Sequence, residues 1–227
     1  MLGNPLLMRR KTTVNPIVGV RMLFQPSPTD TTSTYLTDAT GKTITYAGTV
    51  SLDDDAPFAG TRSILLTGTT DSRCLIGVAA DTAIGTGDFT MEAWYKGTDS
   101  SGYILSNSGT IYTNSFRWGE AGDGGLTLRA GFGLLVGSGS IWRNGTWHHV
   151  AVVRNGNVIT QYVDGVVNAS TIISATITIA GAGKFSIGVD MMNTAYSLSG
   201  RVACVRVSES AVYTAAFTPP TGLFPTV

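Results

Sequence analysis

The sequence predicts a single all-β domain, an antiparallel β-sandwich of the jelly-roll kind. Three observations indicate this class. Short segments rich in β-branched and aromatic residues recur along the chain with turn residues between them. Glycine is abundant, with 28 residues among 227, as many tight turns between strands require. No long segment shows the 3.6-residue period of a helix, and a chain of this length can bury one full core.

The strongest local signal lies between Trp147 and Gly165. Two alternating, β-branched runs flank the pair Asn155-Gly156. This pair favours a two-residue type I′ turn, in which both central residues need a positive φ. A second turn signal, Asp164-Gly165, closes the second run. We therefore expect a β-hairpin here, with the rest of the fold arranged around it.

The other elements follow in chain order. Residues 1–16 have no period and end at the turn-forming pair Asn15-Pro16, so we interpret them as an arm that precedes a domain of residues 17–227. Further strands are expected at residues 17–24, 42–46, 63–67, 73–78, 88–95, 102–107, 115–119, 126–130, 132–136, 176–179, 184–188 and 197–207. Residues 208–216 are expected to form one helical turn that ends before Pro219.

The alternation in residues 88–95 marks a central strand. Phe89 and Met91 fall on one face, whereas Glu92 and Trp94 fall on the other. The two cysteines, Cys74 and Cys204, lie far apart in apolar surroundings. We favour buried free thiols over a disulfide, because two cysteines do not make a disulfide framework.

The charge balance excludes some partners. Only 13% of the residues are charged and the formal net charge is zero, so no overall field draws the protein to nucleic acid or to an anionic membrane. No apolar run reaches the length of about 20 residues that a membrane span needs. The first basic residues follow the apolar patch Leu6-Leu7-Met8 instead of preceding it, unlike a signal peptide. We expect a chain made in the cytoplasm, without a membrane or nucleic-acid partner.

Several motifs stand together in a recognisable order. They are DFTMEAW (88–94), WHHVAVVR (147–154), YVDG (162–165), FSIG (185–188), LSGRV (198–202), VRV (205–207), Tyr213 and FTPP (217–220). In order and spacing they resemble the landmarks of laminin-G-like, concanavalin-A-like jelly-roll domains, in the version common in bacteriophage structural proteins. The resemblance spans residues 17–220 and implies two curved antiparallel sheets. One departure is that Phe24 is followed by Gln25-Pro26, where this group often has an acidic residue and glycine.

The resemblance also implies a non-catalytic role. It points to a structural protein of a phage virion, in the capsid decoration or in the tail, that acts through contacts with other virion proteins and forms a homo-oligomer. Its location would be the virion, after synthesis in the host cytoplasm. The arm fits this role, because its apolar and basic side chains could dock on a neighbouring subunit. These arm residues are Leu6, Leu7, Met8, Arg9, Arg10 and Lys11.

The alternative is a carbohydrate-binding adhesin module that contacts a glycan on a host surface. A glycan platform needs exposed aromatic rings beside polar loops, and three aromatic residues lie in or beside glycine-rich segments. They are Tyr103, Trp118 and Trp142. Trp94 and Trp147 lie within strands and are expected in the core.

A calcium ion is the one cofactor for which we find candidate ligands. Calcium needs several oxygen ligands that converge from loops. The acidic loop residues that could supply them are Asp53, Asp54, Asp55, Asp81 and Asp123. Acidic loops are more often simply solvated, so no cofactor is expected and calcium is the alternative reading of these residues.

Catalysis is not expected. Glycoside hydrolysis requires two carboxyl groups that flank the scissile bond, and the three glutamates, Glu92, Glu120 and Glu209, do not share one strand face. His148 and His149 are adjacent in a strand and point to opposite faces, so they cannot bind one metal together. We expect one of them buried and hydrogen-bonded and the other partly exposed.

Overall fold

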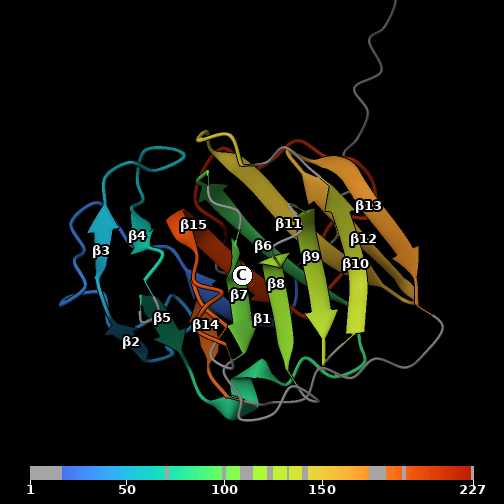
Figure 1. Cartoon of the computed structure of the whole chain (residues 1–227), viewed down its shortest axis with the longest axis horizontal. Helices are drawn as coiled ribbons and strands as arrows, with labels where there is room; N and C mark the ends of the chain where they lie inside the picture. The colour runs from blue at the N-terminus through green and yellow to red at the C-terminus, as the bar shows by residue number, and fades with distance from the viewer. Residues whose placement is uncertain are drawn as a thin grey trace, which may run out of the picture.

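The protein is a sandwich of two antiparallel sheets, which confirms the predicted class. The computed structural model describes residues 17–69, 72–98, 101–107, 115–121, 125–131, 133–139, 143–173, 183–190 and 193–225. Within these ranges, fifteen strands form an eight-stranded and a seven-stranded sheet. Figure 1 shows the seven-stranded sheet in front, with the strands of the other sheet crossing obliquely behind it.

The eight-stranded sheet runs in the order β13 (Val166–Ile172), β12 (Val158–Val163), β11 (His148–Asn155), β6 (Phe89–Lys96), β15 (Ser199–Ser208), β4 (Ser63–Thr67) and β3 (Val50–Asp53), and β1 (Val20–Phe24) also pairs with β15. The seven-stranded sheet runs in the order β10 (Gly133–Gly139), β9 (Gly125–Ala130), β8 (Phe116–Ala121), β7 (Ser101–Asn107), β14 (Phe185–Ile187), β5 (Arg73–Ile76) and β2 (Ile44–Ala47). All pairings between these strands are antiparallel.

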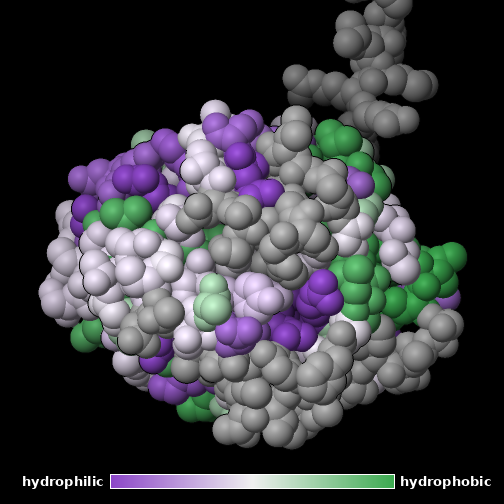
Figure 2. Space-filling view, in the orientation of Figure 1, coloured by the Kyte–Doolittle hydropathy of each residue, from purple (hydrophilic) through white to green (hydrophobic). Residues whose placement is uncertain are grey.

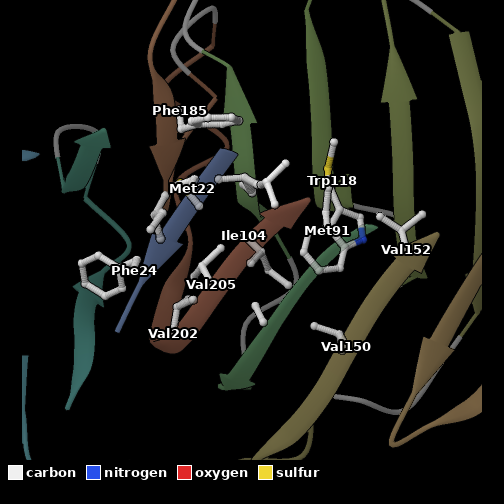
Figure 3. Packing of buried hydrophobic residues seen from close by; sticks show 14 of the residues in the cluster. Met22, Phe24, Met91, Ile104, Trp118, Val150, Val152, Phe185, Val202 and Val205 are labelled. Carbon is white, nitrogen blue, oxygen red and sulfur yellow. The ribbon is translucent and has the colours of Figure 1, made fainter. Parts of the chain in front are cut away.

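One apolar core fills the space between the sheets. Met91 from β6 and Val152 from β11 meet Ile104 and Trp118 from the front sheet, and Figure 3 shows these side chains pointing toward one another. The alternation predicted for the central strand is confirmed, because Phe89 and Met91 belong to this core. Burial of these large side chains supplies the main stabilisation of the fold.

Most predicted strands form within a few residues of the expected bounds. The exceptions have local causes. The strands β3 and β13 are absent from the prediction: β3 alternates but has only four residues, and β13 has no clear alternation of buried and exposed residues. The helical turn predicted at 208–216 is wrong, since these residues form bends and extended segments. A short 3-10 turn forms instead at Ala79–Thr82. The strand predicted at 176–179 lies outside the described residues.

The predicted hairpin forms, but its turn is shifted by one residue. Asn155 pairs with Val158, so Gly156 and Asn157 are the central residues, and of these only Gly156 has a positive φ, +61°. This matches a type II′ turn and not type I′. The next turn carries the type I′ signature, because Asp164 and Gly165 have φ of +51° and +75°. That turn joins β12 to β13.

A β-bulge in β15 aims one arginine outward. Ala203 pairs with Trp94 and Arg206 with Glu92, so two residues of β15 face one residue of β6. Cys204 lies in this bulge and has a positive φ of +47°. Such a bulge changes the direction in which the following side chains point. The guanidinium of Arg206 is thereby placed on the outer face of the eight-stranded sheet, beside Glu92.

Both cysteines are buried free thiols, as predicted. Cys74 lies in the core between the sheets, whereas Cys204 belongs to a separate apolar cluster with Leu23 and Phe224. Burial raises the pKa of Cys204 to about 12, although the hydrogen bond to Thr61 opposes it. Both thiols therefore stay protonated at neutral pH.

The C-terminal segment, residues 209–225, covers the outer face of the eight-stranded sheet. Tyr213 and Phe217 stack with their ring centroids 3.6 Å apart and pack on apolar side chains of β11 and β12. Further along, the ring of Phe224 lies 4.5 Å from the guanidinium carbon of Arg206. Two hydrogen bonds tie the backbone of Phe224 to the Gln25 side chain. The outer face of this sheet is thus sealed by the end of the chain.

A buried carboxylate lies beneath this cover. Glu92 is fully buried and accepts hydrogen bonds from Arg206 at 2.8 and 2.5 Å, from His149 Nε2 at 3.1 Å and from the Tyr213 hydroxyl at 2.8 Å. Burial alone would raise the pKa of Glu92, but these hydrogen bonds and the charge of Arg206 outweigh it and hold the pKa below its ordinary value. Burial also raises the pKa of Tyr213.

No helix within the described ranges is long and apolar enough to cross a membrane.

The two hairpin turns should differ sharply in their tolerance of a side chain. A Cβ at Gly165 would lie 1.9 Å from the carbonyl oxygen of Phe217, whereas a Cβ at Gly156 meets nothing within 4 Å. We expect Gly156→Ala to cost about 1–2 kcal/mol, the price of a left-handed conformation, and Gly165→Ala to cost clearly more, because the C-terminal segment must move. Urea unfolding of both variants measures the difference. Equal losses would contradict the packing of residue 217 on this turn.

Replacing the buried carboxylate should be costly in a pH-dependent way. Glu92→Gln leaves Arg206 without its counter-charge, so we expect a loss of about 3–5 kcal/mol at pH 7. Because the folded-state pKa of Glu92 is lowered, its stabilisation is present above about pH 4.3, the ordinary value for glutamate, and is lost as the pH falls through the folded-state pKa.

Urea unfolding of wild type and Glu92→Gln at several pH values measures this contribution, and the gap between the two should narrow in acid. The control is Glu209→Gln, which removes a partly exposed ion pair with Arg21 and should cost at most about 1 kcal/mol. Similar losses of unfolding free energy in the two variants would show that the buried network contributes no more than the partly exposed ion pair.

Candidate functional site

The outer face of the seven-stranded sheet is the sheet face that the C-terminal segment leaves uncovered. Along β8, Phe116 and Trp118 point into the core, so Arg117 between them points outward. Along β9, Leu128 points inward and Arg129 outward. Figure 2 shows hydrophilic side chains gathered over β8 and β9 in the middle of this face. The strand period thus places two arginines on the same outer face of the sheet.

The two arginines lie directly opposite each other, in register across β8 and β9. Arg117 is largely buried. Its Nη2 donates to the carbonyl oxygen of Gly131, and its Nη1 lies 3.6 Å from Oδ2 of Asp190, whose side chain is also buried. Arg129 is half-buried. In the part of the chain that the structure describes, its guanidinium has neither a hydrogen bond nor an ion pair.

Two tyrosines adjoin this cation pair. Tyr103 lies on the same face, in register with Gly119 of β8, and the half-buried Tyr196 packs edge-on against it with ring centroids 5.9 Å apart. Burial raises the pKa of Tyr103, and the positive charges of Arg117 and Arg129 oppose this rise. Gly119 is required at this place, because a Cβ there would lie 2.7 Å from the Cα of Tyr103.

A short loop holds Tyr196 over the sheet. The bridge between Val189 and Ser197 closes this loop, and the backbone amide of Tyr196 donates to the carbonyl of Asn193 at 3.0 Å. Sequence reasoning missed Tyr196, since nothing in the polar segment around it predicts that the loop folds back over the sheet. The site is therefore a polar surface with two guanidiniums, one buried carboxylate and a tyrosine pair.

Of the residues predicted to form a glycan platform, Tyr103 lies at the site, but neither Tyr103 nor Trp118 is exposed. Trp118 is 0% exposed and Tyr103 is 2% exposed, so neither offers an open ring. Trp118 is buried because the alternation of β8 turns it toward the core, as Figure 3 shows. Tyr103 lies at the site but is covered by Tyr196. Trp142 lies outside the described residues.

Trp94 and Trp147, which were expected in the core between the sheets, are half-buried instead. They pack on the outer-face cluster around Phe224, together with Phe58. The Trp147 Nε1 donates to Asp55 at 3.0 Å. These rings are held by the protein's own side chains.

The predicted calcium ligands in the acidic loop are engaged in ion pairs instead. Arg201 bonds Asp53 at 3.1 Å, Lys96 bonds Asp55 at 2.7 Å, and Arg62 lies 2.8 Å from Asp54. Burial raises the pKa of Asp53, but the hydrogen bonds from Arg201 and from the backbone of Asp55, together with the charge of Arg201, outweigh it and lower the pKa. The hydrogen bond from Lys96 likewise lowers the pKa of Asp55.

The other two candidate ligands do not complete a site. Asp81 accepts the backbone amide of Val78 at 2.7 Å and lies 3.9 Å from Lys42. Asp123 lies outside the described residues. Across the described ranges, no three His, Cys, Asp or Glu side chains are grouped to hold a metal. Among the described residues, local cations thus hold the aspartates that were the alternative calcium ligands.

The paired histidines lie as expected. His149 is fully buried and bonds Glu92, whereas His148 is partly exposed and lies 2.6 Å from Oδ2 of Asp164. The arm residues Leu6 to Lys11 lie outside the described residues.

The sequence profile of the concanavalin A-like lectin/glucanases superfamily matches residues 68–216. The chain belongs to this superfamily. A search of curated protein sequences finds no match.

Solved structures of similar fold share little sequence with the chain. Domain 4 of AbnA, a GH43 extracellular arabinanase from Geobacillus stearothermophilus solved with arabinotriose, is 17% identical with a TM-score of 0.65 over 87% of this chain and 95% of that one. The binding domain of Paraclostridial Mosquitocidal Protein 1 is 13% identical, with a TM-score of 0.63 over 85% of this chain and 49% of that one. This chain thus spans about half of the toxin fragment.

A third similar structure is the CBM40 of a Ruminococcus gnavus sialidase bound to α2,3-sialyllactose. It is 15% identical, with a TM-score of 0.50 over 58% of this chain and 80% of that one. At these identities the three structures establish the fold.

Proposed function

We propose that the chain is a non-catalytic carbohydrate-binding domain, and that the outer face of its seven-stranded sheet holds the ligand. The observation that carries the proposal is the tyrosine pair Tyr103–Tyr196 on a polar sheet face beside Arg129, where Tyr196 and Arg129 are partly exposed. Tyrosine offers a saccharide an apolar ring and a hydroxyl at once. The opposite sheet has no such surface, since residues 209–225 cover it.

Two of the similar structures support this role. The arabinanase domain was solved with arabinotriose and the CBM40 with sialyllactose. They favour glycan binding over the virion role expected from the sequence resemblance, and that role stays a prediction.

The absence of catalysis is part of the proposal. Glu92 is fully buried and ion-paired, so it cannot approach a glycosidic bond. Glu209 pairs with Arg21 of β1, in the other sheet. Neither is available as one of the two carboxyl groups that hydrolysis requires at the tyrosine pair.

Ligand binding should depend on Tyr196. We expect binding to a panel of saccharides that includes arabinotriose and α2,3-sialyllactose, measured on an array and then by calorimetry. Tyr196→Ala should weaken the best binder about tenfold or more, which corresponds to ~1.4 kcal/mol, whereas Tyr196→Phe, which keeps the ring, should retain most of the affinity. Absence of any saccharide binding, or binding indifferent to Tyr196→Ala, would refute the site.

A second role, contact between copies of the chain, is favoured by the edge strand β13. Val166, Val167 and Ile172 are 64%, 49% and 72% exposed on this strand, and Figure 2 shows apolar side chains on this flank beside β10. Long apolar edges are sites of association. Ile17, the first described residue, packs on the outer side of β11 and β12, and β12 pairs directly with β13.

We infer that Leu6, Leu7 and Met8 from the arm of a neighbouring copy cover this edge. Deleting residues 1–16 should then leave a folded monomer where the full chain is an oligomer, as sedimentation would show, with circular dichroism as the check on folding. Replacing the three apolar arm residues by serine should have the same effect. An unchanged mass after deletion, or a monomeric full chain, would contradict arm exchange.

A further inference from the structure

The charges on the proposed glycan-binding face do not balance. Arg117 and Arg129 lie opposite each other on neighbouring strands, and like charges in this position destabilise a sheet. Asp190 is the carboxylate that the structure places against them, and it lies beside Arg117. Both Asp190 and Arg117 are buried. One positive charge, that of Arg129, is left over at the surface.

The surroundings of Arg129 do not neutralise it. Apart from Arg117, the described outward-facing side chains beside it are neutral: Thr127 on its own strand, Leu134 across β10, and Tyr103 nearby. Neither a hydrogen bond nor an ion pair holds the guanidinium within the described ranges. The cation is half-buried, so it is less hydrated than a free side chain while its donors stay unused.

We propose that the saccharide bound here is acidic, and that Arg129 binds its anionic group; the inference rests on the proposed glycan-binding function. The planar guanidinium offers a fork of donors that fits the two oxygens of a carboxylate or sulfate. Tyr103 lies near enough to feel the charge of Arg129 and Tyr196 packs against Tyr103, so the two rings would contact the sugar while Arg129 holds the acid.

The two sources of an anionic group are a sugar carboxylate and a sugar sulfate. Three probes of equal length separate them: a uronic-acid trisaccharide, the same trisaccharide with its carboxyl groups reduced to alcohols, and a sulfated neutral trisaccharide. Calorimetry with the full chain gives each affinity. We expect the acidic probes, one or both, to bind about tenfold or more tightly than the reduced probe, and this preference to shrink as salt is added.

Arg129→Gln should abolish that preference while leaving the weak binding of the neutral probe. Arg129→Lys keeps the charge without the fork and should keep part of the preference. Arg21→Gln is the matched control, because it removes the same charge from the other sheet and should change nothing in binding. Urea unfolding of each variant confirms that it is folded.

The outcomes separate the two proposals. Equal affinity for the reduced and the acidic probes, with binding still lost in Tyr196→Ala, overturns the acidic ligand and leaves the glycan site in place. A preference for acid that survives Arg129→Gln also overturns the assignment to Arg129. Absence of binding by every probe and every saccharide of the panel removes both proposals together.

Discussion

The buried carboxylate of Glu92 constrains much of this structure. A carboxylate away from water must be paired and fully hydrogen-bonded, and its partners come from three other parts of the chain: β11 supplies His149, β15 supplies Arg206, and the C-terminal segment supplies Tyr213. Because a carboxylate only accepts hydrogen bonds, Nε2 of His149 must carry the proton. One side chain on the central strand therefore fixes two neighbouring strands and the path of the chain end.

Because of this network, the protein itself covers the outer face of one sheet and not that of the other. The arginine reaches Glu92 because of the bulge at Cys204, and the aromatic rings of residues 213–224 then close over the pair. That face is occupied by the protein itself. Among the described residues, only the short loop that carries Tyr196 lies over the outer face of the seven-stranded sheet. One carboxylate, that of Asp190, lies against the two arginines of this face, Arg117 and Arg129. Asymmetry between the sheets, more than any single motif, locates the candidate site.

The sequence was informative where a pattern is local. The hairpin, the alternation of β6 and the burial of one of the two adjacent histidines all follow from residue spacing, and all are observed. The same rule could have placed Trp118 in the core, since Phe116 and Trp118 share a face of β8, but the neighbouring glycine-rich segment suggested an exposed ring. Strand β13 lacks alternation, because it is an edge exposed along both faces. The position of the turn at Gly156 depended on register, which residue preferences define only to within one residue.

Long-range charge compensation could not be predicted in the same way. Asp53 and Asp55 look like free acidic ligands in the sequence, yet Arg201 and Lys96, far along the chain, neutralise them. Conversely, Arg129 looks like an ordinary surface charge until the register of β8 and β9 sets it opposite Arg117. The tertiary structure decides whether a charged side chain forms an ion pair within the fold or stays available to a ligand.

The folding unit extends beyond the segment that the family profile matches. The match covers residues 68–216, but β15 pairs on one side with β1 and β4, which precede it, and Arg206 lies under Phe224, which follows it. Gln25 joins both ends through its two hydrogen bonds to Phe224. A fragment limited to the matched residues would expose the β15 edge and leave the Glu92–Arg206 pair without its aromatic cover. The cost of burying that charge pair thus makes the flanking segments part of the domain.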